Sequence, residues 1–235
     1  MSLLVRLAED PQQTAIFLDV DGVLAPIVAR PESARVPEET REELRRLNRR
    51  YALVACISGR AGSVARQIVG VPELTYVGNH GLELEPEAED WTERLRRFLA
   101  DVGWPHYLEN KVLTAALHYR GVADETAARA QLEAIAGDAR EAGFIARFGR
   151  KVLEIVPPID ADKGTAVRRL LTEHALTRAL FAGDDTTDLD GFAALDGLEV
   201  AVRVAVSSSE GPPALRDAAD LVIGVADVLA LLRRL

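Results

Sequence analysis

Three acidic residues stand close together in the last third of the chain. Asp184, Asp185 and Asp188 follow directly on an apolar run at residues 179–182. In a folded site these carboxylates would repel one another unless a cation lay among them. Hard oxygen ligands in small number suit Mg²⁺, which keeps several waters and takes one or two carboxylates plus a substrate phosphate. The cluster therefore predicts magnesium-assisted phosphate chemistry, although an acidic, solvated helix start gives the same pattern.

A second group of acids lies near the N-terminus. Asp19 and Asp21 follow the apolar run at residues 15–18. Ligands of an open α/β sheet bind beyond the carboxyl ends of its strands, where two carboxylates at i and i+2 can lean toward one point. Gly22 lets the chain turn away from that point. Taken alone, the pair also matches an ordinary Asp-Gly turn at the end of a strand.

Two further segments carry groups that can hold a phosphate. Ser58-Gly59-Arg60 follows the apolar run at residues 53–57 and opens a helix, so its hydroxyl and backbone N–H groups can bind phosphate oxygens. Lys163 begins another helix and can place an ammonium on the same phosphate. A Ser N-cap and a surface lysine are each common. The argument for a site is that all four segments are expected at one edge of one sheet.

The elements that position these residues follow an alternating pattern. Short continuous apolar runs predict buried parallel strands, and amphipathic segments between them predict helices. Such alternation indicates a doubly wound α/β core. The expected strands are residues 15–18, 53–57, 74–77, 179–182 and 198–202, and the expected helices are residues 37–48, 61–69, 163–174 and 225–235.

The middle of the chain interrupts this alternation. A helix is expected at residues 90–102, two strands at 107–111 and 114–120, a second helix at 124–142, and two more strands at 144–148 and 152–156. The repeated αββ order predicts a small α+β module that covers one face of its own sheet. We therefore expect a catalytic core at 1–84 plus 159–235 and an inserted domain at 85–158.

Composition excludes several classes of protein. The net charge of −9 argues against a nucleic-acid partner, because a phosphate backbone requires a positive surface. The single cysteine, Cys56, lies in an apolar run and allows no intramolecular disulfide. No apolar stretch is long enough to cross a bilayer, and the acids near the N-terminus do not fit a signal peptide. These features predict a cytoplasmic protein with no membrane partner.

With these motifs in view, the sequence resembles the haloacid dehalogenase-type phosphohydrolases, and within them the trehalose-6-phosphate phosphatases. The superfamily's four motifs match Asp19-x-Asp21, Ser58, Lys163 and Gly183-Asp184-x-x-x-Asp188. The more specific strings are DVDGVLAPI, SGR, GNHGLE, ENKVLTAALHYRG, KVLEIVPP, DKG and GDDTTD. The resemblance covers essentially the whole chain, and it implies that the inserted α+β module is a cap.

The resemblance also implies roles for individual residues. Asp19 would attack phosphorus and become phosphorylated, and Asp21 would protonate the leaving sugar oxygen and later deprotonate the attacking water. Mg²⁺ would be held by Asp19, the backbone carbonyl of Asp21 and Asp184, and it would stabilise the charge of the transition state. Ser58 and Lys163 would hold the remaining phosphate oxygens.

Other residues would support the site or bind the substrate. Asp185 and Asp188 would orient metal-bound waters and Lys163. Gly59 and Arg60 would contact the phosphate, and Asn79 the sugar or the cap. In the insert, the residues matching the family's sugar-binding positions are Glu109, Lys111, Arg120 and Glu154.

For His118, also in the insert, sugar contact and solvent exposure remain equally open, and the sequence leaves the role of Arg150 open as well.

Three alternatives remain at this point. The substrate is expected to be trehalose 6-phosphate, but another sugar phosphate, such as sucrose phosphate or mannosylglycerate phosphate, fits the same motifs. A mutase acting on sugar phosphates is a weaker alternative. A non-catalytic sugar-phosphate sensor would not need the Asp19/Asp21 pair. The chain shows no glycosyltransferase-like region, so no fused synthase domain is expected.

Overall fold

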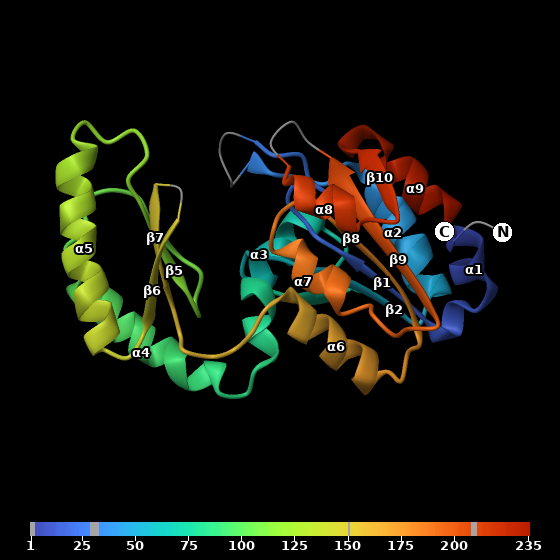
Figure 1. Ribbon diagram of the computed structural model, residues 1–235, viewed down its shortest axis with the longest axis horizontal. Coiled ribbons are helices and arrows are strands. Elements are labelled where there is room, and N and C mark those ends of the chain that lie inside the picture. Colours follow the sequence, from blue (N-terminus) through green and yellow to red (C-terminus); the bar gives the residue numbers. More distant parts are fainter. Residues whose placement is uncertain (1–2, 29–32, 150, 208–210) are drawn as a thin grey trace. The chain divides into compact units, whose positions relative to one another are not determined.

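The computed structural model describes residues 3–28, 33–149, 151–207 and 211–235, and it divides into two compact units. The first unit comprises residues 1–81 and 161–235, and we call it the core unit. The second comprises residues 82–160, and we call it the insert. Figure 1 shows a sheet with helices in each of them.

The core unit is built on one parallel sheet of six strands in the order β10-β9-β8-β1-β2-β3. Neighbouring strands are parallel throughout, and β1 and β2 are buried along their whole length, as expected when helices cover both faces. The strands are β1 (Thr14–Leu18), β2 (Leu53–Ile57), β3 (Thr75–Val77), β8 (Arg178–Gly183), β9 (Val200–Ser207) and β10 (Leu221–Gly224).

Helices of the core unit pack on both faces of this sheet (Figure 1). Side chains of α1, α2, α3 and α9 join alternate strand residues such as Ile16 and Leu180 in one apolar cluster. Phe181 points to the other face and packs edge-to-face on Phe192 of α7, with ring centroids 5.9 Å apart. The helices are α1 (Leu3–Glu9), α2 (Glu38–Arg50), α3 (Gly62–Val69), α6 (Lys163–Glu173), α7 (Asp188–Ala193), α8 (Pro213–Ala218) and α9 (Val228–Arg234).

The insert has an antiparallel sheet of its own, in the order β4-β5-β7-β6. Its helices α4 and α5 pack on one face of the sheet through a second apolar cluster that includes Leu95, Leu132 and Leu153. The elements are α4 (Ala88–Asp101), β4 (Leu108–Asn110), β5 (Ala115–His118), α5 (Glu125–Glu141), β6 (Ile145–Gly149) and β7 (Val152–Val156). The predicted fold class, a doubly wound parallel core with an inserted αββαββ module, is confirmed.

Several details differ from the prediction. The strand expected at residues 198–202 instead runs over Val200–Ser207, because Glu199 belongs to the turn that bonds back to Thr177. The short elements α1, α7, α8 and β10 were not predicted, because few residues carry too weak a periodicity. The helix expected at 225–235 begins as a 3₁₀ turn, Val225–Asp227.

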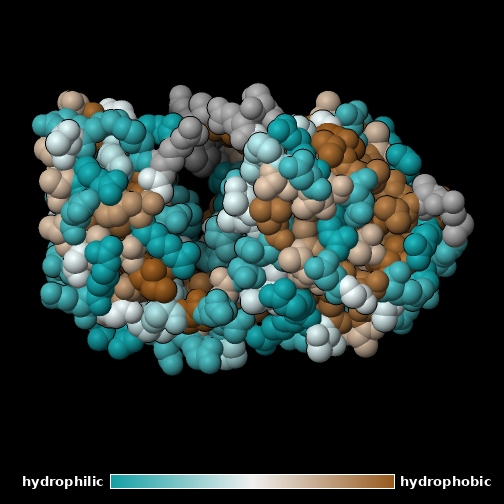
Figure 2. Space-filling view, viewed as in Figure 1, coloured by the Kyte–Doolittle hydropathy of each residue, from teal (hydrophilic) through white to brown (hydrophobic). Residues whose placement is uncertain are grey.

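The surface of the core unit carries an apolar groove of about 600 Å³. Figure 2 shows apolar side chains gathered over the region of α9 and β10. Among the described residues, the ionisable ones that line the groove are Glu38 and Glu39, both acidic. Within the described ranges, no helix is both long enough and apolar enough to span a bilayer.

Candidate active site

Lys163 lies at the centre of the buried charges of the core unit. It is the first residue of α6, whose start is fixed by Asp162, the N-cap that accepts a hydrogen bond from the Thr165 amide at 2.6 Å. The Lys163 ammonium lies 3.0 Å from Oδ2 of Asp19 and 2.6 Å from Oδ1 of Asp188. Its side chain is only 2% exposed. The capped helix start thus holds one cation between two acids from different parts of the sequence.

Asp188 organises the turn between β8 and α7. While its Oδ1 accepts from Lys163, its Oδ2 accepts from the backbone amides of Asp184 at 2.8 Å and Asp185 at 2.9 Å. Gly183 makes room for this side chain, because a Cβ there would lie 2.2 Å from Cγ of Asp188. Both oxygens of Asp188 therefore have protein donors, as expected of a residue that orients Lys163 and the loop. The Asp185 side chain is exposed and accepts from the next amide.

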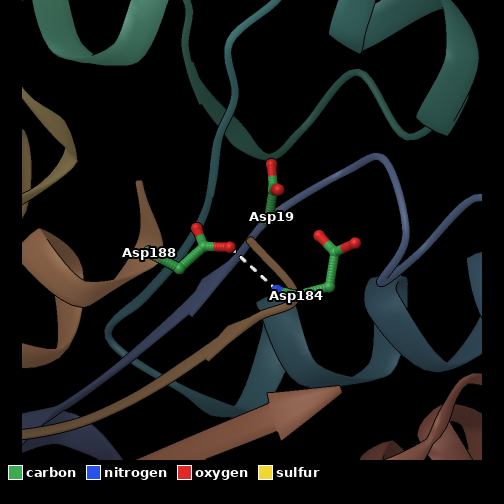
Figure 3. A group of neighbouring side chains, drawn as sticks. All are labelled: Asp19, Asp184 and Asp188. Carbon is green, nitrogen blue, oxygen red and sulfur yellow. Dashed lines mark hydrogen bonds between the residues drawn. The ribbon is translucent and has the colours of Figure 1, made fainter. Parts of the chain in front are cut away.

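Three carboxylates converge at the ends of β1 and β8 (Figure 3). One oxygen each of Asp19, Asp184 and Asp188 lies within 4.8 Å of the others. Asp19 is held by its backbone bond to Ala182 of the neighbouring strand, at 2.9 Å. The structure thus brings together the two acidic segments that are 165 positions apart, from residue 19 to residue 184.

The pKa values show how strongly this site resists negative charge. Burial raises the pKa of Asp19 to about 7, with Asp188 adding to the effect and Lys163 opposing it. Burial likewise raises the pKa of Asp184 to about 8, and the charges of Asp19 and Asp188 add to it. For Lys163, burial alone would lower the pKa, but Asp19 and Asp188 together raise it above its usual value.

The charge balance fits a divalent cation. Three buried carboxylates share one ammonium, so two negative charges remain uncompensated when all the acids are ionised. Oxygen donors of this kind suit Mg²⁺. Asp188 already has three protein donors, which leaves Asp19 and Asp184 as the carboxylates better placed to hold the ion.

Gly22 is required where the loop after β1 meets Asp184. Its φ is +77°, and a Cβ there would lie only 2.0 Å from Oδ2 of Asp184. The amide of Gly22 also donates to the carbonyl of Ala25 at 2.8 Å, which closes the turn. The sequence suggested Gly22 only as a place to turn, whereas the structure shows that its missing side chain makes room for a carboxylate.

The loop after β2 places Ser58 and Arg60 beside the acid pair. Ser58 is buried, and its Oγ accepts from the Arg60 amide at 3.2 Å. The Arg60 guanidinium binds Asp21 twice, through Nε at 2.6 Å and Nη2 at 2.7 Å. This two-point contact had no signal in the sequence, where Arg60 was expected on the substrate. That expectation stays a prediction.

The segment Asn79-His80-Gly81 supports the same loop. All three residues have positive φ, at 51°, 55° and 106°. The Asn79 amide donates to the Arg60 carbonyl at 2.8 Å, and the His80 amide donates to the Ser58 carbonyl at 2.9 Å. A Cβ on Gly59 would lie 2.6 Å from the His80 ring. Asn79 is buried, and its backbone amide helps to hold the loop that carries Arg60. Its predicted contact with the sugar or the cap stays a prediction.

In the insert, two of the predicted sugar-binding residues, Glu109 and Glu154, lie on strands of its sheet. Pairing of the strands sets Glu109, Ala116, Glu154 and Arg147 in one row. Their neighbours Leu117 and Leu153 point into the helix-covered cluster, so the row lies on the opposite face.

Other polar residues gather around Glu109. Its carboxylate lies 4.0 Å from the Lys111 ammonium and 3.6 Å from Nε2 of His118. Arg120 follows β5 and is exposed. Arg150, whose role was left open, lies outside the described residues.

The chain is similar to one family model and to several known proteins. The family model described as trehalose-phosphatase matches residues 17–102 and 106–219. A probable trehalose-phosphate phosphatase 2 from Oryza sativa is 28% identical over 99% of this chain and 70% of its own length. The trehalose-phosphate phosphatase of Mycobacterium ulcerans is 33% identical over 81% of this chain, which spans about half, 53%, of that relative.

Solved structures share the fold. Trehalose-6-phosphate phosphatase from Aspergillus fumigatus superposes with a TM-score of 0.64 at 24% identity, covering 98% of this chain and 95% of that one. A haloacid dehalogenase-like hydrolase from Bacteroides thetaiotaomicron gives 0.62 at 17% identity, covering 95% and 99%. The fold is therefore haloacid dehalogenase-like. Because the family model matches most of its length, the chain belongs to the trehalose-phosphatase family of phosphoric monoester hydrolases.

Proposed function

We propose that this protein is a Mg²⁺-dependent phosphatase that hydrolyses trehalose 6-phosphate to trehalose and phosphate. The observation that carries the proposal is the buried group formed by Lys163, Asp19, Asp184 and Asp188, in a chain of the trehalose-phosphatase family. One ammonium and a cation between carboxylates suit a dianionic phosphate ester. When bound, Mg²⁺ would supply charge stabilisation to the transferring phosphoryl group, held by Asp19, Asp184 and the carbonyl of Asp21.

The reaction proposed for these residues has two displacements. Asp19 attacks phosphorus, the bond to the sugar oxygen breaks, and Asp21 gives its proton to that oxygen. Water then attacks the phosphoryl group on Asp19, Asp21 takes the proton of the water, and phosphate leaves. Lys163, the Ser58 hydroxyl and the amide of Gly59 hold phosphate oxygens in both steps.

The insert is proposed to act as the cap that selects the sugar. Support comes from the polar row on its open sheet face, where Glu109 and Glu154 lie on either side of the small residue Ala116. Carboxylates and an ammonium on one face can hydrogen-bond the hydroxyls of a disaccharide. Lys111 and Arg120 are proposed to join them.

A screen of phosphate release tests the substrate. Trehalose 6-phosphate, sucrose 6-phosphate, mannosylglycerate phosphate and glucose 6-phosphate would be compared at equal concentration with Mg²⁺. We expect kcat/KM for trehalose 6-phosphate to exceed the others by about 10²-fold, the scale of one or two lost hydrogen bonds to charged groups. A higher value for another ester would replace the substrate. Binding without release of phosphate from any ester would instead indicate a sensor.

A further inference from the structure

Arg60 and Asp21 form a two-point ion pair between the loops after β1 and β2. Nε lies 2.6 Å from Oδ2 and Nη2 lies 2.7 Å from Oδ1. The Arg60 side chain is 16% exposed and that of Asp21 is 37% exposed, so the guanidinium is the more enclosed partner. A bidentate contact of this kind fixes both the position and the plane of a carboxylate.

The backbone that carries the guanidinium is itself tied down. The Arg60 carbonyl accepts from Asn79, and the Arg60 amide donates to the hydroxyl of Ser58. The His80 ring lies against Gly59, where an added Cβ would lie only 2.6 Å from the ring. Residues 79–81 have three consecutive positive φ values, and this backbone conformation places the ring and the amides. Such a conformation costs energy and persists only where the surrounding structure requires it.

We propose that Arg60 is the positioning residue for Asp21 and acts chiefly in the second displacement. The inference rests on the proposed function. With both oxygens accepting from Arg60, the carboxylate keeps lone pairs with which it can take a proton from water. As water attacks, its oxygen bonds to phosphorus, the bond between phosphorus and Asp19 breaks, and the proton moves to Asp21.

An aryl phosphate separates the two displacements. Nitrophenolate leaves without a proton, so kcat/KM for p-nitrophenyl phosphate reports phosphorylation of Asp19 without help from Asp21. Decay of the phosphoenzyme, followed by acid quench after a single turnover, reports the step that needs Asp21 as a base. Misplacing a base by about 1 Å costs roughly 10²-fold.

For Arg60→Ala we therefore expect phosphoenzyme decay to slow by about 10²-fold, while kcat/KM for p-nitrophenyl phosphate stays within about threefold of wild type. Arg60→Lys keeps the charge without the two-point geometry and should fall between. The matched control is Arg46→Ala, which removes an ion pair with Glu43 on α2 and should change neither quantity. In the Asp21→Asn background, Arg60→Ala should add no further loss, because it acts through Asp21.

Other results would overturn the inference. An equal fall in kcat/KM and in the decay rate would mean that Arg60 binds the phosphate itself. Unchanged kinetics with a lowered melting temperature would make the pair a structural link between two loops. Additive losses in the double variant would also exclude action through Asp21. A wild-type enzyme that forms no phosphoenzyme would refute the proposed mechanism, and that outcome is visible before any Arg60 variant is made.

Discussion

At the residue scale, the main feature of the site is its excess of negative charge, with three carboxylates beside one ammonium. Lys163 contacts Asp19 and Asp188 directly, and the Asp184 carboxylate adds a third negative charge nearby. Removing Lys163 from this group would be costly, because the remaining negative charges would stay desolvated and unpaired. The same excess of negative charge favours binding of a divalent cation. Each acid can therefore be tested by what its loss does to the chemistry and to the fold.

Replacing Asp19 with Asn should remove the nucleophile and leave the fold intact. The amide keeps the shape of the carboxylate and takes one negative charge out of a crowded site, so the melting temperature without metal should not fall. Turnover should drop by at least about 10³-fold, as the loss of a nucleophile usually requires. Phosphate release and circular dichroism would measure the two effects. Retention of more than about a tenth of the wild-type rate would exclude this role for Asp19.

Gly22 offers a test of the space around Asp184. In Gly22→Ala the new methyl would displace the carboxylate as well as strain the backbone, so we expect weaker Mg²⁺ binding and a loss of activity of tenfold or more. Gly197→Ala is the matched control, because Gly197 also has positive φ, +83°, but no neighbouring side chain or backbone of the described residues lies within 4 Å of the added Cβ.

Both glycine variants should lose about 1 kcal/mol of stability from backbone strain. Thermal unfolding and titration with Mg²⁺ would separate that common loss from the effect on the site. If Gly197→Ala lowered Mg²⁺ affinity as much as Gly22→Ala, the close approach to Asp184 would not be the cause.

At the scale of elements, the two sheets have different tasks. The parallel sheet of the core unit brings strand ends together, so residues distant in sequence reach one point. The antiparallel sheet of the insert has one face covered by α4 and α5, which leaves the other for polar residues. This division predicts that changes on the open face alter substrate choice more than the chemistry.

Glu154 on β7 tests the open face. Because sugar contacts far from the broken bond help to align the phosphate, Glu154→Ala should lower kcat/KM for trehalose 6-phosphate by roughly 10²-fold. Hydrolysis of p-nitrophenyl phosphate, which has no sugar, should stay within a few-fold of wild type. Glu133→Ala is the control in the same unit, since Glu133 pairs with Arg129 on helix α5. Equal losses on both substrates would assign Glu154 to folding or to the core site.

At the scale of the whole molecule, the net charge of −9 adds to the local excess of acids, so metal binding and protonation should compete. The pKa values of Asp19 and Asp184 are raised from 3.8 to about 7 and about 8 in the folded protein. Each group therefore binds its proton more tightly when folded than when unfolded. The stability it contributes is present below pH about 4 and is lost as the pH rises through about 7 to 8.

The resulting prediction concerns Mg²⁺ and pH together. Since Mg²⁺ binds the ionised carboxylates, it should raise the melting temperature little at pH about 5 and substantially above pH about 8. Without metal, stability should decline between these pH values. Asp184→Asn should make that decline smaller and abolish most of the Mg²⁺ effect. Thermal unfolding across the pH range, with excess Mg²⁺ or with chelator, would measure this. A Mg²⁺ effect that weakened with rising pH would contradict the assignment.

Local sequence pattern was sufficient to predict the class of fold and the acids that gather at one edge of the core sheet. A continuous apolar run indicates a strand that is buried on both faces of its sheet, and acids directly after such a run indicate the end of that strand. Both patterns involve residues close in sequence, so they can be recognised without the fold. The core strands beginning near residues 15, 53 and 179, and the acids Asp19, Asp184 and Asp188, could be predicted for that reason. Short elements such as α7 and β10 could not, because tertiary packing rather than local pattern stabilises them.

Contacts between side chains from distant segments could not be predicted in this way. The hydrogen bonds between Arg60 and Asp21 connect residues 39 positions apart in the sequence. The close approach of Gly22 to Asp184 involves residues 162 positions apart. The His80 ring against Gly59 likewise depends on left-handed backbone at residues that do not usually adopt it. Contact distance is set by the register of parallel strands and the path of the loops between them. Neither leaves a periodic trace in the sequence, so these contacts became visible only in the folded chain.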